Sequence, residues 1–102
     1  MEAALTHEAF TQHANTQFQV LVAENTAVPL ELIEISDVKL YPHQEQFGIV
    51  FRGPSEMFLG QGSRYFAHDQ MGQFELFIVP IKQDEHGFYY EAIFNRLREQ
   101  ST

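Results

Sequence analysis

The chain has 102 residues, no cysteine, no tryptophan and a formal net charge of −8. A domain of this length removes roughly two-thirds of its unfolded surface from water, so it can fold without disulfides or metal. The lack of cysteine excludes disulfide frameworks, thiolate zinc sites and cysteine nucleophiles. Acidic residues are spread along the whole chain and repel phosphate backbones and anionic lipid, so we expect neither a nucleic-acid nor a membrane partner.

The amino-terminal segment lacks the basic start and apolar core of a secretory signal. The apolar runs are also shorter than the roughly 20 residues that a membrane-spanning helix requires. We therefore expect a soluble, cytoplasmic protein that folds as one domain over residues 1–102, with residues 98–102 forming a frayed polar tail.

A short helix is predicted over residues 6–15. Thr6 can serve as its N-cap, with the acidic Glu8 in the first turn. Leu5 and Phe10 occupy the two positions of a hydrophobic staple. The apolar side of this helix is small, so it should plug one end of a sheet structure instead of forming a layer of its own.

Six strands are predicted, over residues 17–24, 28–38, 46–52, 64–69, 74–81 and 89–97. Alternation in the first strand sets Phe18, Val20 and Val22 on the inner face and leaves Leu21 among glutamines on the other. The second strand changes phase near residues 32–33, which indicates a β-bulge there.

The last two strands should form a hairpin, because residues 84–87 begin with Asp and end with Gly, as a type I turn favours. This turn predicts a register that pairs Gln83 with Phe88, Ile81 with Tyr90, Val79 with Ala92, Phe77 with Phe94, and Glu75 with Arg96. Pro80 cannot donate to a ladder, so it should lie at an edge or a bulge.

Short strands, tight turns and no βαβ alternation predict a mainly β fold, either a small antiparallel barrel or a two-sheet sandwich. We favour the barrel because both faces of the predicted hairpin are apolar. The irregular connection 55–63 is long enough to cap an open end, and its apolar residues should fold back over the sheet. Ten phenylalanines and four tyrosines predict a core rich in ring contacts.

Five segments resemble a family of small, uncharacterised bacterial proteins that is classed as a domain of unknown function. They are FRGP at 51–54, GQGSRY at 60–65, HDQMG at 68–72, ELFIVPI at 75–81 and YEAIFN at 90–95. The resemblance supports the domain boundaries and implies no activity. It also associates the chain with phage-tail-like or tail-collar proteins, and it points to Arg52, His68, Glu91 and Asn95 without giving them roles.

Motifs for catalysis and metal binding are missing from the sequence. The five histidines have no metal-ligand spacing, and the adjacent His68 and Asp69 would point to opposite faces of a strand, so His68 is expected to hydrogen-bond the nearby turn instead. Residues 60–62 are glycine-rich but are not followed by the lysine and helix of a phosphate loop, so they indicate a turn. The sequence contains no Gly-x-Ser-x-Gly elbow. We therefore expect a non-enzymatic protein without a metal or a cofactor.

The candidate binding residues are Arg52, His68, Asp69, Tyr90, Glu91 and Asn95. A protein partner or self-association is expected to use an aromatic surface comprising Tyr65, Phe66, Tyr89 and Tyr90, because tyrosine suits surfaces that are apolar on one side and wet on the other. Asn95 should be buried and hydrogen-bonded. The first functional hypothesis is a binding or assembly module, accessory to a phage-tail-like or surface assembly. The alternative is a small-molecule pocket, enzymatic or not, near His68, Glu91 and Asn95.

Overall fold

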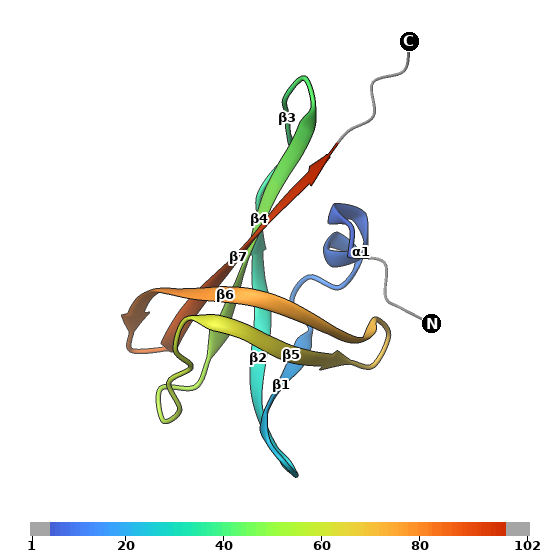
Figure 1. Ribbon diagram of the computed structural model, residues 1–102. Helices are drawn as coiled ribbons and strands as arrows, with labels where there is room; N and C mark the ends of the chain where they lie inside the picture. The colour runs from blue at the N-terminus through green and yellow to red at the C-terminus, as the bar shows by residue number, and fades with distance from the viewer. Residues whose placement is uncertain (1–4, 98–102) are drawn as a thin grey trace.

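The computed structural model describes residues 5–97, which form a mainly β domain (Figure 1). Its elements are α1 (His7–Gln12), β1 (Gln17–Ala23), β2 (Thr26–Ile35), β3 (Lys39–Leu40), β4 (Gln44–Gly53), β5 (Gly62–His68), β6 (Gly72–Asp84) and β7 (Gly87–Leu97). The predicted polar tail at 98–102 lies outside the described residues.

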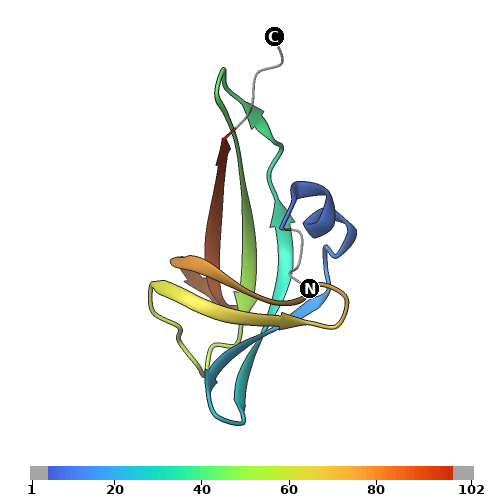
Figure 2. The same cartoon turned by 45° about the vertical axis from the view of Figure 1, so that its right-hand side comes forward.

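Six of the strands close into an antiparallel barrel. The sheet has the order β2-β1-β5-β6-β7-β4-β3, and a further pairing of β2 with β4 closes it. Two three-stranded meanders, β1-β2-β4 and β5-β6-β7, are joined through the β1–β5 and β4–β7 pairings. The β5–β6 hairpin crosses the long strands β2, β4 and β7 at a steep angle (Figures 1 and 2). The mainly β prediction is confirmed, and the observed form is the barrel.

The amino-terminal helix begins where it was predicted and ends earlier. The side chain of Thr6 caps α1 by accepting a hydrogen bond from the backbone N–H of Ala9 at 3.0 Å. The helix stops at Gln12, because Asn15 adopts a left-handed conformation with φ of 65° and its N–H donates to the carbonyl of Leu32 in β2. That bond ties the end of the helical segment to the barrel.

The bulge predicted in the second strand is confirmed. The register between β2 and β4 shifts between Leu32 and Glu34, so Ile33 is the inserted residue. The prediction that Val22 faces inward was wrong, since this side chain is 37% exposed. Phe18 and Val20 are buried as predicted, but the end of the β1–β2 hairpin extends past the body of the barrel (Figure 1).

The register predicted for β6 and β7 holds beside the turn and fails beyond a bulge. Gln83 pairs with Phe88 as predicted, but the register then shifts between Pro80 and Lys82, so Pro80 lies opposite Tyr90. The expectation that Pro80 sits at a bulge is confirmed. From Ile78 back to Gly72, β6 pairs with β5 instead of β7, while β7 pairs with β4 from Phe88 to Leu97.

The bulge reverses which face of β6 points inward. Leu76 and Ile78 are buried, whereas Phe77 and Ile81, which the predicted register placed on one apolar face with Tyr90 and Phe94, are 53% and 46% exposed. One inserted residue is enough for this reversal, because successive side chains of a strand point to opposite faces. The predicted charge pair of Glu75 with Arg96 is replaced: the register puts Glu75 opposite Tyr65 in β5 and Arg96 opposite Glu45 in β4.

Phe10 of α1 fills the gap left where β6 and β7 separate. Its ring lies 6.1 Å from that of Phe74 in β6 and 5.3 Å from that of Phe94 in β7, measured between centroids. The side chain is fully buried. Figure 1 shows α1 in the angle between the upper part of β7 and β6. The helix therefore acts as the plug that the sequence predicted.

The other end of the barrel is covered by the connection between β4 and β5. Leu59 is buried there, while Met57 and Phe58 are 43% and 55% exposed, so the predicted return of this segment to the core is confirmed for one of its three apolar residues. The backbone N–H of Leu59 donates to the hydroxyl oxygen of Tyr90 at 2.9 Å. This bond anchors the connection to β7.

Candidate functional site

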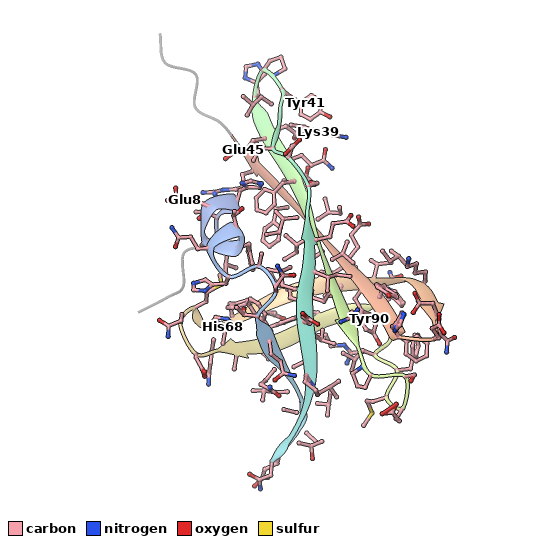
Figure 3. The ribbon with its side chains drawn as sticks, turned by 180° about the vertical axis from the view of Figure 1, so that it is seen from behind. Glu8, Lys39, Tyr41, Glu45, His68 and Tyr90 are labelled. Atoms are coloured by element: carbon pink, nitrogen blue, oxygen red, sulfur yellow. The ribbon has the colours of Figure 1, made fainter. Side chains whose placement is uncertain are left out.

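The six candidate binding residues are dispersed over the barrel. Figure 3 shows His68 beside α1 and Tyr90 on the opposite side of the barrel. His68 lines a cleft of about 590 Å³, whereas Glu91 lines a separate cavity of about 190 Å³, and Asn95 lines neither. The pocket hypothesised to unite these three residues is not formed by them.

Arg52 lies on the outer face of the barrel in a network of paired groups. Its Nη2 donates to Oε1 of Glu31 in β2 at 2.7 Å. On its other side it faces Tyr89 in β7, whose hydroxyl donates to Oδ2 of Asp84 at 2.9 Å. Hydrogen bonding to Tyr89 and the charge of Glu31 raise the pKa of the guanidinium. Arg52 thus cross-links three strands, and its partners were not identifiable from their sequence positions.

Tyr90 belongs to the core. Its side chain is fully buried, and burial raises the pKa of its hydroxyl. The predicted aromatic surface is wrong for most of its members, since Phe66, Tyr89 and Tyr90 are all buried and Tyr65 alone of the four is strongly exposed, at 63%.

Glu91 and Asn95 point outward from β7. Asn95 is exposed opposite Gln46 of β4, so the prediction that it is buried was wrong. Successive side chains of a strand point to opposite faces. Because Tyr90 and Ala92 of β7 face the core, Glu91, Ile93 and Asn95 face outward.

His68 ties the β5–β6 turn to the segment that follows α1. Its Nδ1 accepts hydrogen bonds from the backbone N–H groups of Gln70 at 3.1 Å and Met71 at 3.2 Å. Nδ1 therefore carries no proton, and in the neutral ring Nε2–H donates to the hydroxyl of Thr16 at 2.9 Å. That hydroxyl donates to the carbonyl of His13 at 2.6 Å. The prediction that His68 bonds the nearby turn is confirmed.

Burial and the neighbouring His13 lower the pKa of His68. The two rings are 4.8 Å apart between centroids, so a charge on His13 disfavours a charge on His68. Protonation at Nδ1 would also break both bonds to the turn. Asp69, the next residue, is exposed in that turn. Within residues 5–97 no group of three or more His, Asp and Glu side chains is arranged to hold a metal ion.

An exposed apolar surface lies on the outer face of β1, β5 and β6. Leu21 pairs with Tyr65, and Phe77 pairs with Ser63, which is two residues from Tyr65 on the same face of β5. The exposed fractions of Leu21, Tyr65 and Phe77 are 44%, 63% and 53%. We call these three residues the outer apolar patch. A cavity of about 250 Å³ beside it is lined by Leu21, Tyr65 and Glu75, among others.

The sequence contained a partial signal for this patch. Leu21 interrupts the polar face of a strand whose other outward residues are glutamines, and Tyr65 was already expected at a surface. Phe77 was missed because its exposure depends on the bulge near Pro80, which the assumed register did not include.

The fold and surface define a small closed antiparallel barrel with a helical plug and an apolar patch on its outer wall. None of the helices in the described part of the chain is long and apolar enough to cross a membrane. A family model described as a domain of unknown function, DUF6916, matches residues 5–94, and the chain belongs to this family. No curated protein and no solved structure is significantly similar to the chain.

Proposed function

We propose that the protein is a non-catalytic binding module that contacts another protein through the outer apolar patch. The observation that carries this proposal is the adjacency of Leu21, Tyr65 and Phe77 on a solvent-facing wall. Scattered exposed apolar residues are normal, but adjacent ones with a polar rim are typical of protein contact sites. The rim here includes Gln73 and Glu75.

The partner is a different protein with an apolar centre and a basic rim. The charge of −8 makes two copies of this chain repel each other, which disfavours self-association through a patch that is bordered by the acidic Glu75. Glu75 lies directly opposite Tyr65 and is exposed, so it can pair with a lysine or arginine of the partner. Tyrosine and phenylalanine supply large contact areas at low entropic cost.

The setting that we propose is a phage-tail-like or surface assembly of a bacterium, to which the protein is a cytoplasmic accessory. The support for this setting is the resemblance of the chain to small bacterial proteins associated with such assemblies. The genes that flank the coding sequence therefore supply the first partners to be assayed.

Binding by the patch variant Y65S/F77S tests the proposal. Both side chains point outward, so the variant should fold, and removing two central aromatic contacts should weaken binding to an assembly protein at least about thirtyfold. I93S is a matched control, since Ile93 is 48% exposed on the outer face of β7. The assay is calorimetric titration of each candidate protein into wild-type protein and both variants.

The expected result is loss of binding in Y65S/F77S and unchanged binding in I93S. Equal affinity of wild-type protein and Y65S/F77S for a partner would show that the patch is not the contact surface. A concentration-dependent dimer of wild-type protein that Y65S/F77S abolishes would instead assign the patch to self-association.

A further inference from the structure

A second surface, rich in glutamine, adjoins the end of α1. It is the cleft of about 590 Å³, whose lining includes Gln17, Gln19, His68, Asp69, Gln70 and Gln73. We call it the glutamine cleft. Its volume lies in the range of small-molecule sites, roughly 300–1,000 Å³. Gln73 also borders the outer apolar patch, but Leu21, Tyr65 and Phe77 do not line the cleft, so the cleft requires its own explanation.

Four glutamines from three segments line this cleft. Gln17 and Gln19 come from β1, Gln70 from the β5–β6 turn and Gln73 from β6. An amide offers a carbonyl acceptor and two N–H donors at neighbouring positions. A hydroxyl group likewise donates and accepts, so vicinal hydroxyls of a sugar match a row of amides.

The charges of the lining favour a neutral ligand. None of the described residues that line the cleft is lysine or arginine, and Asp69 adds a carboxylate. A phosphate or a carboxylate would enter without a cationic partner and beside a like charge, which costs affinity. A neutral polyol avoids this cost, and it can also donate hydroxyl hydrogens to Asp69.

Hydrogen bonds hold the backbone on two sides of the cleft. His68 joins the 69–72 turn to Thr16, and Thr16 in turn joins the carbonyl of His13. Asn15 holds the same segment to Leu32 of β2 at 2.7 Å. A preformed site loses less conformational entropy on binding than a flexible one.

We propose that the glutamine cleft binds a neutral carbohydrate through the amides of Gln17, Gln19, Gln70 and Gln73 and the carboxylate of Asp69. Single sugars bound by a few hydrogen bonds in an open cleft should have dissociation constants on the order of 1 mM. The cleft and the outer apolar patch share Gln73 at their border, and the three residues that define the patch do not line the cleft.

The test is NMR titration of isotope-labelled full-length protein with glucose, galactose, mannose and N-acetylglucosamine, and with glucuronate as an anionic counterpart of glucose. At least one neutral sugar should give saturable shifts at the side-chain amides of the cleft. The variant Q17A/Q19A should bind that sugar at least about tenfold more weakly, because two hydrogen-bonding groups are lost. Q83A is the matched control, since Gln83 is exposed at the far end of β6, and it should bind as wild-type protein does.

Three results would overturn the proposal. They are no saturable shift with any of the four neutral sugars, shifts that map away from the cleft, and unchanged affinity in a folded Q17A/Q19A. Binding of glucuronate as tight as that of glucose would contradict the argument from charge. The variant Y65S/F77S retains the cleft, so it should bind the sugar normally even where it has lost its protein partner.

Discussion

Replacement of Tyr90 by phenylalanine removes one oxygen atom from the core and should destabilise the domain measurably. The hydroxyl oxygen accepts the backbone N–H of Leu59 at 2.9 Å in a fully buried setting. Without it, the N–H of Leu59 is left without that partner and away from water. An unsatisfied buried donor costs about 1–3 kcal/mol, so we expect a loss of about 2 kcal/mol in the free energy of unfolding.

For a domain of this size, that loss corresponds to a decrease in Tm of about 8–16 °C. The effect should also be local, because the lost bond anchors the β4–β5 connection to β7. Amide hydrogen exchange measured by NMR should show faster exchange at Leu59 in Y90F, beyond the change expected from global stability alone.

The control is Y65F, which removes a hydroxyl from a ring that is 63% exposed. Its Tm should stay within about 4 °C of the wild-type value, because surface changes of this kind alter stability by less than about 0.5 kcal/mol. A wild-type Tm for Y90F with Leu59 still protected from exchange would refute the assigned anchoring role of Tyr90.

Three further predictions concern the plug, a turn and pH. F10A should lower the free energy of unfolding, measured by urea denaturation, by about 3–5 kcal/mol, because the buried ring of Phe10 fills the gap between β6 and β7. A loss below about 1 kcal/mol would show that the gap closes without this ring. G87A should lower the free energy of unfolding by about 3 kcal/mol or more, since φ of Gly87 is 134° and a Cβ there would overlap the carbonyl of Gly53. G72A should lower it by only about 1 kcal/mol, because φ of Gly72 is 78° and a Cβ there would enter open space. Equal losses in the two variants would contradict this. Because the pKa of His68 is lowered in the folded state, the unfolded chain takes up the proton at a higher pH than the folded protein does. The free energy of unfolding should therefore be at its full value above about pH 6.5 and should fall as the pH drops below 6.5 toward the pKa of the folded state. The fall should be smaller in H68N, which keeps an acceptor for the turn amides, and parallel stability profiles of wild-type protein and H68N would contradict this.

The sequence predicted the fold well where local chemistry dominates. The capping bond of Thr6 reaches only as far as Ala9, and the phase change around Ile33 requires an extra residue in the strand. The turn at 84–87 correctly paired Gln83 with Phe88. In each case the deciding interaction lies within a few residues of chain.

The failures concern choices between distant partners. Either face of β6 is apolar enough to be buried, so Phe77 and Ile78 compete, and the bulge near Pro80 decides between them. The proline indicated a bulge, but not that β6 changes partner from β7 to β5 beyond it. Asn95 was misplaced for the same reason, because its neighbour in β4 is far away in sequence.

The candidate site was predictable only in part. His68 was identified, and its bonds to the following turn were expected from its position. Its partner Thr16 is 52 residues away, and only the closed barrel brings the two together. The outer apolar patch likewise combines three strands, so periodicity within one strand could show Leu21 as unusual but could not supply its neighbours.

Photocrosslinking from position 65 tests the proposed protein contact most directly. A photoreactive phenylalanine in place of Tyr65 should crosslink in cells to one protein of the proposed assembly, while the same group in place of Ile93, which is also exposed, should not. Equal crosslinking from both positions, or products from position 65 that contain only copies of this chain, would contradict a partner bound at the outer apolar patch.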